Sequence, residues 1–203
     1  MSAPGGAVRV DWTLPPGRVD WLTGSGATRG EQAAVWAVAL AALGVVVAAA
    51  QREGTAWSWW QWLLVGALVL DVVGGVVANA LGTAKRLYHG PVPAGAGPVG
   101  RFVHHHVRFT ALHVHPLVLV PLLPGATLTW ALTWYVTCLA GVALVTRLPL
   151  HLQRPAALGV LAIALVLAPV VAAPDSLAWF GPVLVAKLVV AHAVREEPYR
   201  PMR

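Results

Sequence analysis

Apolar residues in this chain gather in long runs that contain few polar positions. An α-helix needs about 20 mainly apolar residues to cross the hydrocarbon core of a bilayer, and six runs come close to that length. They cover residues 33–50, 59–81, 103–123, 126–146, 156–173 and 177–194. Turn-forming residues separate the later runs, at Pro124-Gly125, Arg154-Pro155 and Pro174-Asp175. The pattern predicts six membrane-spanning helices, of which the third is the weakest because its first turns are polar.

The composition also favours a membrane location. Hydrophobic residues make up 58% of the 203 residues and charged residues only 11%, whereas a soluble domain carries about 25% charged residues. A single soluble core could not cover this much apolar side chain, so lipid must cover the excess. The predicted fold class is therefore an all-α integral membrane protein, built as a six-helix bundle. A cytoplasmic or interfacial segment (1–32) precedes the transmembrane domain (33–194), and a cytoplasmic tail (195–203) follows it.

The positions of the basic residues orient these spans, because cytoplasmic loops are enriched in Lys and Arg. With the N-terminus inside, only Arg52 falls in an outer loop, while Arg108 and Lys187 lie within spans. The other basic residues all fall in inner segments: Arg9, Arg18, Arg29, Lys85, Arg86, Arg101, Arg147, Arg154, Arg195, Arg200 and Arg203. We therefore expect a bacterial cytoplasmic membrane with both termini inside. This placement also explains the net charge of +6, so we expect no nucleic-acid partner.

The two ends of the chain carry short motifs. Residues 9–12 and 18–21 both read Arg-Val-Asp-Trp, with the turn signal Pro15-Pro16-Gly17 between them. We expect two short interfacial pieces on the cytoplasmic face, and the alternative is that they cap an opening on that side. The tail around Glu196 and Glu197 is expected to be solvated, and the alternative is that it bends back toward the histidines.

Three ionisable residues fall at matching depth within the spans. Counting a rise of 1.5 Å per residue, Asp71, His113 and Lys187 each lie about 15–18 Å from the start of their span, near the middle of the bilayer. Ionisable groups at this depth are costly, face the bundle interior and indicate function. We expect Asp71 and Lys187 to neutralise each other, and His113 to exchange a proton with either. The alternative is an ion pair that only fixes helix register.

A second polar layer lies nearer the cytoplasm and contains Asn79, His106 and His192. His192 is five residues beyond Lys187, about 140° round an α-helix, so we expect it to point elsewhere or toward another helix. The second span also has a face of small residues, which favours close approach of another helix or a ligand: Gly74, Gly75, Ala78 and Gly82.

Five of the eight histidines lie between His104 and His115. On a regular helix, His106 and His113 would share a face, and Pro116 would bend the helix and expose the Leu112 carbonyl. Histidine suits zinc, iron or manganese. The candidate metal ligands, alongside Asp71, are His89, His106, His113, His115 and His192.

These residues suggest a small membrane enzyme that acts on a hydrophobic, lipid- or isoprenoid-like molecule by acid–base or metal-assisted chemistry. The candidate catalytic residues are Asp71, His113, Lys187 and Asn79. One alternative is a proton-coupled transporter or channel that uses the same cluster as a relay, for which a homodimer would supply the missing half. Another is a b-type haem protein, in which His106 and His192 match best in depth. A retinal-type pigment is disfavoured because only six spans are predicted.

Overall fold

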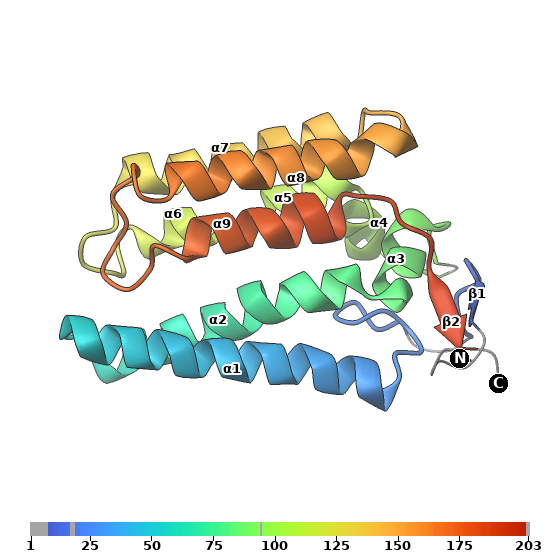
Figure 1. The fold of residues 1–203 in the computed structure, drawn as a ribbon. Coiled ribbons are helices and arrows are strands. Elements are labelled where there is room, and N and C mark those ends of the chain that lie inside the picture. The colour runs from blue at the N-terminus through green and yellow to red at the C-terminus, as the bar shows by residue number, and fades with distance from the viewer. Residues whose placement is uncertain (1–7, 17–18, 94, 202–203) are drawn as a thin grey trace, which may run out of the picture.

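The computed structural model describes residues 8–16, 19–93 and 95–201, and this part of the chain is mostly helical (Figure 1). Among the described residues, four helices are long and apolar enough to cross a membrane. They are α1 (Arg29–Glu53), α2 (Trp59–Ala80), α7 (Leu128–Val145) and α8 (Leu150–Leu167). A shorter apolar helical stretch covers Phe180–His192. Four of the six predicted spans are thus single helices of spanning length, and the other two are not.

The remaining elements are short. The helices are α3 (Gly82–His89), α4 (Pro98–Val103), α5 (His106–Ala111), α6 (His115–Leu119), α9 (Phe180–Val185) and the π-helix η1 (Ala186–His192), and the strands are β1 (Val8–Val10) and β2 (Tyr199–Pro201). Helix α9 continues directly into η1, so the last apolar segment is one helical rod whose second half has the wider π winding.

Local sequence sets the ends of the long helices. Thr28 and Glu31 form a capping box at the start of α1, in which each side chain accepts a hydrogen bond from the other residue's backbone N–H. Gly54 ends this helix in the left-handed conformation, with a φ of 67°. At the start of α7, the Thr127 hydroxyl accepts a hydrogen bond of 3.1 Å from the Trp130 backbone N–H.

The prediction of a continuous third span over residues 103–123 is wrong. The chain forms α4, α5 and α6 there, with one interruption at His104 and His105 and another between Leu112 and Val114. The second interruption precedes Pro116, which lacks a backbone N–H and clashes with the carbonyl of the residue four positions earlier in a helix. The Leu112 carbonyl instead accepts a hydrogen bond of 2.9 Å from Val114 N–H. The bend expected at this proline is therefore a complete break.

The expected break at Arg154 and Pro155 is also wrong, because both residues lie within α8. Pro155 is early in this helix, where it removes a single intrahelical hydrogen bond. The connection from α7 to α8 is instead at residues 146–149, and Pro149 directly precedes α8. The fifth apolar helix thus begins and ends about six residues earlier than its run of apolar residues indicates.

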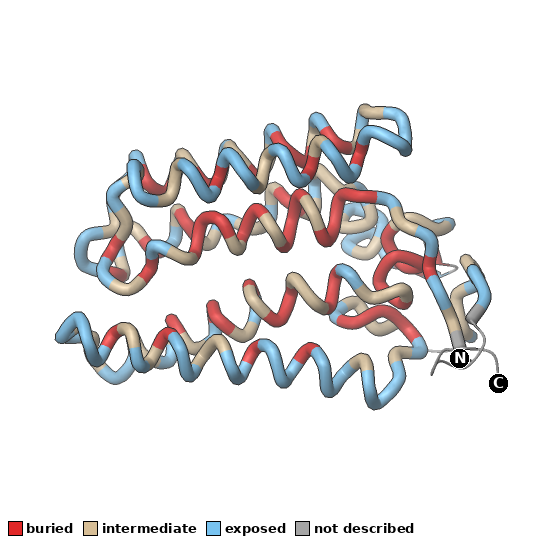
Figure 2. The backbone as a smooth tube through the Cα atoms, viewed as in Figure 1, coloured by how far each residue is buried: buried red, intermediate tan, exposed pale blue. Residues whose placement is uncertain are grey.

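The last helical rod lies at the centre of the molecule. Helix α9 and η1 contact α2 on one side and α7 and α8 on the other, while α1 packs along α2. Figure 2 shows that the rod is largely buried, whereas α1 and α8 expose much of their surface. Those exposed surfaces carry large apolar side chains such as Trp36, Leu40, Ile163 and Val166, as expected of surfaces that face lipid.

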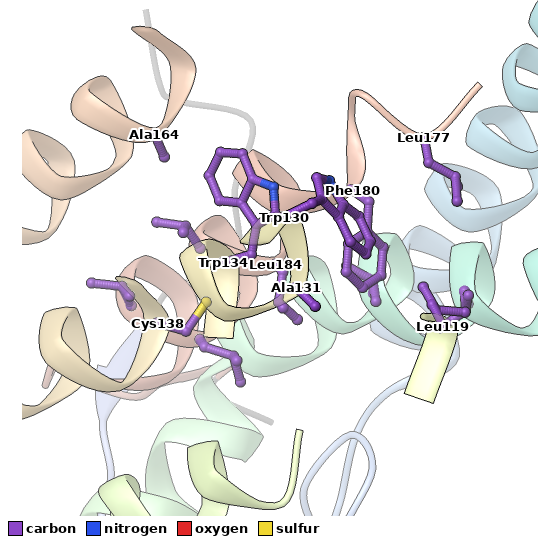
Figure 3. Packing of buried hydrophobic residues seen from close by; sticks show 14 of the residues in the cluster. Leu119, Trp130, Ala131, Trp134, Cys138, Ala164, Leu177, Phe180 and Leu184 are labelled. Atoms are coloured by element: carbon purple, nitrogen blue, oxygen red, sulfur yellow. The ribbon is translucent and has the colours of Figure 1, made fainter. Parts of the chain in front are cut away.

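Buried aromatic side chains pack α7 against α9 (Figure 3). Trp130, Trp134 and Phe180 are almost completely buried, and the Trp130 and Phe180 rings lie 5.6 Å apart. The Trp134 indole lies directly against Gly181, at a position that a side-chain carbon on residue 181 would occupy. Glycine at this position therefore permits the two helices to approach closely.

Both described ends of the chain lie at the same end of the bundle, beside α3 and α4 (Figure 1). They pair as antiparallel strands, with Val10 opposite Tyr199. The start of the tail crosses α3 at Gly82, where an added Cβ would lie 2.8 Å from the Tyr199 carbonyl oxygen. The tail is therefore held against the protein rather than extended into solvent. We call this end of the molecule, which carries β1, β2, α3 and α4, the basic end.

Candidate functional site

The predicted contact between Asp71 and Lys187 is confirmed. The Lys187 Nζ atom of η1 donates a hydrogen bond of 2.8 Å to Oδ2 of Asp71 in α2. The two side chains differ in exposure, since Lys187 is 5% exposed and Asp71 is 43% exposed. The ammonium group is therefore enclosed by the bundle, while the carboxylate is accessible from the opposite side.

Gly75 makes room for this ion pair. A Cβ added at Gly75 would lie 2.5 Å from Lys187 Cε, so the lysine stem crosses α2 directly over the glycine backbone. The adjacent Gly74 instead faces α1, where its added Cβ would lie 3.3 Å from the Cβ of Ala39. The expected close approach of another helix is found at Gly74, whereas Gly75 accommodates the side chain of Lys187.

The imidazole nearest to Asp71 belongs to His115 rather than to His113. His115 Nε2 lies 3.6 Å from Asp71 Oδ2. His113 Nδ1 lies 2.9 Å from the Phe109 carbonyl oxygen, and its ring centre is 5.4 Å from that of His115. His113 is thus beside the ion pair but one ring further away. His115 takes the position expected for His113 because the break between α5 and α6 changes the directions of both side chains from those in a regular helix.

Asp71 lines an apolar groove of about 550 Å³ between α1 and α2. Its walls are built mainly of small and apolar residues, namely Val35, Trp36, Ala39, Ala67, Leu70, Gly74, Gly75 and Ala78. The N-terminal segment contributes Asp20, Leu22 and Thr23 to the lining. A carboxylate with a buried cationic partner therefore faces a space suited to an apolar molecule.

The N-terminal segment covers one end of this groove. The Trp21 carbonyl accepts a hydrogen bond of 2.7 Å from the Tyr88 hydroxyl, and the Thr23 carbonyl accepts one from the Thr83 hydroxyl. Thr23 and Ser25 are buried. The described part of the second Arg-Val-Asp-Trp motif, residues 19–21, therefore lies beside this groove, which fits the alternative that the motif caps an opening.

Asp20 organises this capping loop. Its carboxylate accepts hydrogen bonds from Leu22 N–H (2.8 Å), Thr23 N–H (3.2 Å) and the Thr23 hydroxyl (2.6 Å). Partial burial by itself raises the pKa of Asp20, but these hydrogen bonds outweigh it and the pKa is lower than its ordinary value. The ionised carboxylate therefore stabilises the loop that closes the groove.

The second polar layer contains three histidines in contact with one another. His106 Nδ1 lies 3.1 Å from His192 Nε2, and His89 Nε2 lies 2.8 Å from the His192 carbonyl oxygen. The His89 and His106 ring centres are 4.4 Å apart. His89 was expected just past the second span, and α3 brings it into this layer. We call His89, His106 and His192 the histidine layer, and Asp71, Lys187, His113 and His115 the ion-pair layer.

His192 points toward other helices, which is one of the two expected alternatives: its ring contacts His106 of α5 and its carbonyl contacts His89 of α3. The expected angle of about 140° from Lys187 assumed an α-helix. Residues Ala186–His192 form a π-helix, in which hydrogen bonds join residues five apart and so place them one above the other. The hydrogen bond of 3.1 Å from Ala193 N–H to the Leu188 carbonyl shows this spacing. Both Lys187 and His192 therefore face inward.

Two further residues join η1 to the elements around it. Asn79 Nδ2 donates a hydrogen bond of 3.5 Å to the Lys187 carbonyl oxygen, so this candidate catalytic residue contacts the backbone of η1. Phe109 lies between the two layers, with its ring centre 4.1 Å from that of His192 and 4.7 Å from that of His113. The layers are therefore adjacent but separated by an aromatic ring.

Sequence reasoning missed the position of Lys85, which it treated as a loop charge. This side chain is buried in α3, and its Nζ donates hydrogen bonds of 2.5 Å to the Ala191 carbonyl and 2.6 Å to the Val194 carbonyl. Glu196 in the tail lies 3.8 Å away. Burial lowers the pKa of Lys85 to about 8. Lys85 therefore caps the C-terminal end of the central helix, where exposed carbonyl groups favour a cation.

The candidate metal ligands do not form one site. Throughout the described ranges, no group of three or more His, Cys, Asp or Glu side chains is arranged to hold a metal ion. His113 and His115 belong to the ion-pair layer, while His89, His106 and His192 belong to the histidine layer. The haem pairing also fits poorly, because axial ligands bind the iron from opposite faces of the porphyrin, whereas the nitrogens of His106 and His192 are within hydrogen-bond distance.

Comparison with protein-family models, with curated proteins and with solved structures found no match to the chain. The fold therefore defines the protein only as a helical chain with four segments able to cross a membrane. The ion-pair layer adds a chemical property to that class. It combines a carboxylate, an ammonium group and two imidazoles beside an apolar groove, and this set of groups can take up and release protons.

Proposed function

We propose that this protein is a six-span enzyme of a bacterial cytoplasmic membrane that moves a proton on a hydrophobic molecule bound beside Asp71. The observation that carries the proposal is the asymmetry of the ion pair. The Asp71 carboxylate lines an apolar groove, while its cationic partner, Lys187, is enclosed behind it. A general base has to contact the atom from which it takes a proton, and Asp71 is the member of the pair that a ligand in the groove can reach.

The chemistry assigns a different function to each side chain. Asp71 takes the proton, and Lys187 remains ionised and stabilises the negative charge that develops. His115, at 3.6 Å from Asp71 Oδ2, exchanges the proton with the carboxylate. His113 is held by the Phe109 carbonyl and lies next in line to His115. Asn79 positions Lys187 through the backbone of η1.

The six-span arrangement is supported by the ends of the chain. Pairing of β1 with β2 joins the two described ends of the chain, and ends that share one side of a membrane are separated by an even number of crossings. The two additional crossings are the rod Phe180–His192 and the interrupted segment from α4 to α6, which is buried partly by neighbouring helices. Non-helical backbone within a membrane is tolerated where it is covered by protein. Exposed Trp59 and Trp60 at the start of α2 fit the opposite interface.

The substrate class follows from the groove. Its lining is largely apolar, and the outer faces of α1 and α2 expose Trp36, Leu40 and Leu63. A molecule dissolved in the bilayer could therefore enter sideways between these helices. We infer a lipid- or isoprenoid-like substrate with an acidic C–H or O–H group placed at the Asp71 carboxylate.

The test uses protein reconstituted into nanodiscs made from a bacterial lipid extract, with mass spectrometry of the organic phase before and after incubation. Wild-type protein is expected to convert one hydrophobic component. The double variant Asp71→Asn/Lys187→Met removes both charges together, so it should fold and yet convert nothing. Asp175→Asn, which changes an exposed carboxylate at the opposite end, is the matched control and should remain active. Conversion by the double variant would disprove the assignment.

A proton-coupled transporter is the second candidate, and a specific observation favours it. Protonatable side chains continue from His115 and His113, past Phe109, to His192 and His106 near the basic end. Proteoliposomes with an internal pH-sensitive dye test this alternative. Proton flux that needs Asp71 and His106, without chemical change in any lipid component, would favour the transporter, and a dimer of this chain would then supply the second half of the pathway.

A further inference from the structure

A second cavity of about 750 Å³ lies at the basic end, between the start of α5 and the α7–α8 connection. It shares no lining residue with the groove at Asp71. Its rim carries the exposed arginines Arg101, Arg108, Arg147 and Arg195. Its lining also includes four histidines, His89, His104, His105 and His106. Among the described residues that line it, there is no Asp or Glu.

The arginines of this cavity retain most of their hydrogen-bond donors. Arg101 donates only Nε to the Ala96 carbonyl, and Arg147 donates a long hydrogen bond of 3.4 Å to the Ala143 carbonyl. The guanidinium groups of Arg108 and Arg195 lie over aromatic rings, 5.6 Å from the centre of Phe102 and 4.8 Å from that of Trp12. Stacking holds a guanidinium in place without using its N–H groups.

None of these four arginines forms an ion pair with a carboxylate in the part of the chain that the structure describes. The Nε2 atom of His104, which also lines this cavity, is buried and forms no hydrogen bond with any described residue. Several cationic groups therefore converge on one concave space that lacks a counter-charge. Guanidinium groups match the oxygen geometry of phosphate and bind it through paired hydrogen bonds.

We propose that this cavity binds a phosphate or diphosphate group, either free or as the headgroup of a lipid. The arginines at the rim supply the charge, and His104 and His106 supply further hydrogen bonds from within. Leu150, which is 60% exposed and lies on the same lining, leaves one side open to lipid. The proposal does not rest on the chemistry at Asp71, because the two sites have no residue in common.

A neighbouring cavity at the same end provides the internal control. Its lining contains Glu31, Glu196 and Glu197 together with Lys85 and Arg154. Arg154 Nε lies 4.0 Å from Glu196 Oε1. This cavity has a volume of about 870 Å³, shares Arg195 and Leu150 with the first, and has a lining of mixed charge. Substitution of Arg154 therefore serves as a control, because it removes a basic residue that orients the protein in the membrane without changing the first cavity.

The experiment measures binding of two probes to the full-length protein. Pyrophosphate is titrated against detergent-solubilised protein by calorimetry, and phosphatidic acid is compared with phosphatidylcholine in nanodiscs by native mass spectrometry. We expect the triple variant Arg101→Gln/Arg108→Gln/Arg147→Gln to weaken binding by about 100-fold or more, because it removes three guanidinium groups that form charge-assisted hydrogen bonds with phosphate oxygens. Arg154→Gln should leave binding unchanged, and an unchanged melting temperature confirms that both variants fold.

The outcomes separate the two sources of the phosphate group. Saturable pyrophosphate binding that the triple variant loses indicates a soluble anion as ligand. If the wild-type protein retains phosphatidic acid selectively but does not bind pyrophosphate, and the triple variant loses this retention, the ligand is a lipid headgroup. The proposal is overturned if neither probe binds, or if Arg154→Gln weakens binding as much as the triple variant, because the arginines would then serve only to orient the protein. Loss of activity in Asp71 variants would not affect any of these results.

Discussion

The ion-pair layer and the histidine layer lie next to each other along η1, but their buried polar groups are stabilised in opposite ways. In the ion-pair layer, the charge of Lys187 is balanced by Asp71 at 2.8 Å. The histidine layer contains no carboxylate among its described neighbours. His106 contacts the His192 ring and His89 contacts a backbone carbonyl, while His192 Nδ1 is buried without a hydrogen-bond partner among the described residues. A carboxylate permits a buried charge, whereas its absence favours neutral rings linked by hydrogen bonds.

The difference extends to the surroundings of each layer. Asp71 faces an apolar groove that a bilayer-soluble molecule could occupy, while the His106 side of the histidine layer faces a cavity rimmed by arginines. Burial, together with the nearby His106 and Lys85, lowers the pKa of His89 to about 3, so this ring is neutral at physiological pH. One layer is thus built to carry charge, and the other is built to remain uncharged beside a cationic site.

The largest expected effect comes from Asp71→Asn. It leaves the ammonium of Lys187 enclosed without a counter-charge, and breaking a buried pair costs about 3 kcal/mol, which corresponds to a fall of roughly 6–12 °C in melting temperature for a chain of this size. Thermal unfolding in detergent measures the loss. The additional change Lys187→Met should restore most of it. Failure of the double variant to regain stability would show that the layer is not organised around a balanced charge.

The histidine layer should respond less strongly, and His106→Leu tests this. The substitution removes the partner of His192 Nε2, and an unsatisfied buried polar group costs about 1–3 kcal/mol. Because no net charge is left behind, we expect about half the loss seen for Asp71→Asn. His105→Leu changes an exposed neighbour and should remain within about 0.5 kcal/mol of wild type. A loss for His106→Leu as large as that for Asp71→Asn would remove the distinction between the layers.

Sequence reasoning located the ion pair but not all of its surroundings, for a physical reason. Depth counting assumes a fixed rise per residue, and this assumption holds for Asp71 in the regular helix α2. For Lys187 it holds only in part, because the count starts at Leu177 whereas α9 begins at Phe180 and Lys187 lies within η1. Charge pairing of two such residues follows from the cost of an isolated charge in lipid. The ion pair was therefore predictable from the sequence.

Several of the errors arise where the winding of a helix changes. The break before Pro116 places His115 rather than His113 beside Asp71, and the π winding changes the angle between Lys187 and His192. After the earlier interruption at His104 and His105, Arg108 lines the cavity at the basic end. A proline in the sequence indicates where a helix can break, but the direction of the chain after the break depends on tertiary packing. A π-helix has no comparable signal in the sequence.

A smaller effect is expected from Gly75→Ala, with Gly74→Ala as its matched control. Both substitutions gain similar helix propensity, about 1 kcal/mol, so the difference between them isolates the side-chain contact. The new methyl at residue 75 would lie 2.5 Å from Lys187 Cε and must displace the ammonium from Asp71, whereas at residue 74 it meets Ala39 at 3.3 Å. We expect Gly75→Ala to be less stable than Gly74→Ala by about 1–2 kcal/mol, measured by thermal unfolding. Equal stability of the two variants would mean that Lys187 can reach Asp71 without passing over the backbone of Gly75.

The smallest effect concerns the loop that closes the groove of the ion-pair layer. The hydrogen bonds to Asp20 lower its pKa below the ordinary value of 3.8, so the ionised group contributes stability that is fully present above that value. This contribution is lost as the pH falls through the lower pKa of the folded state. Asp20→Asn should therefore reduce stability at pH 7 by at most about 1 kcal/mol, because the loop is partly solvated. The difference from wild type should shrink below pH 3.8, whereas Asp175→Asn, an exposed change at the opposite end, should have no effect at pH 7. A difference that persists undiminished in acid would show that the carboxylate charge does not hold the loop, and the cap on the groove would then depend on the hydrogen bonds of Trp21 and Thr23 alone.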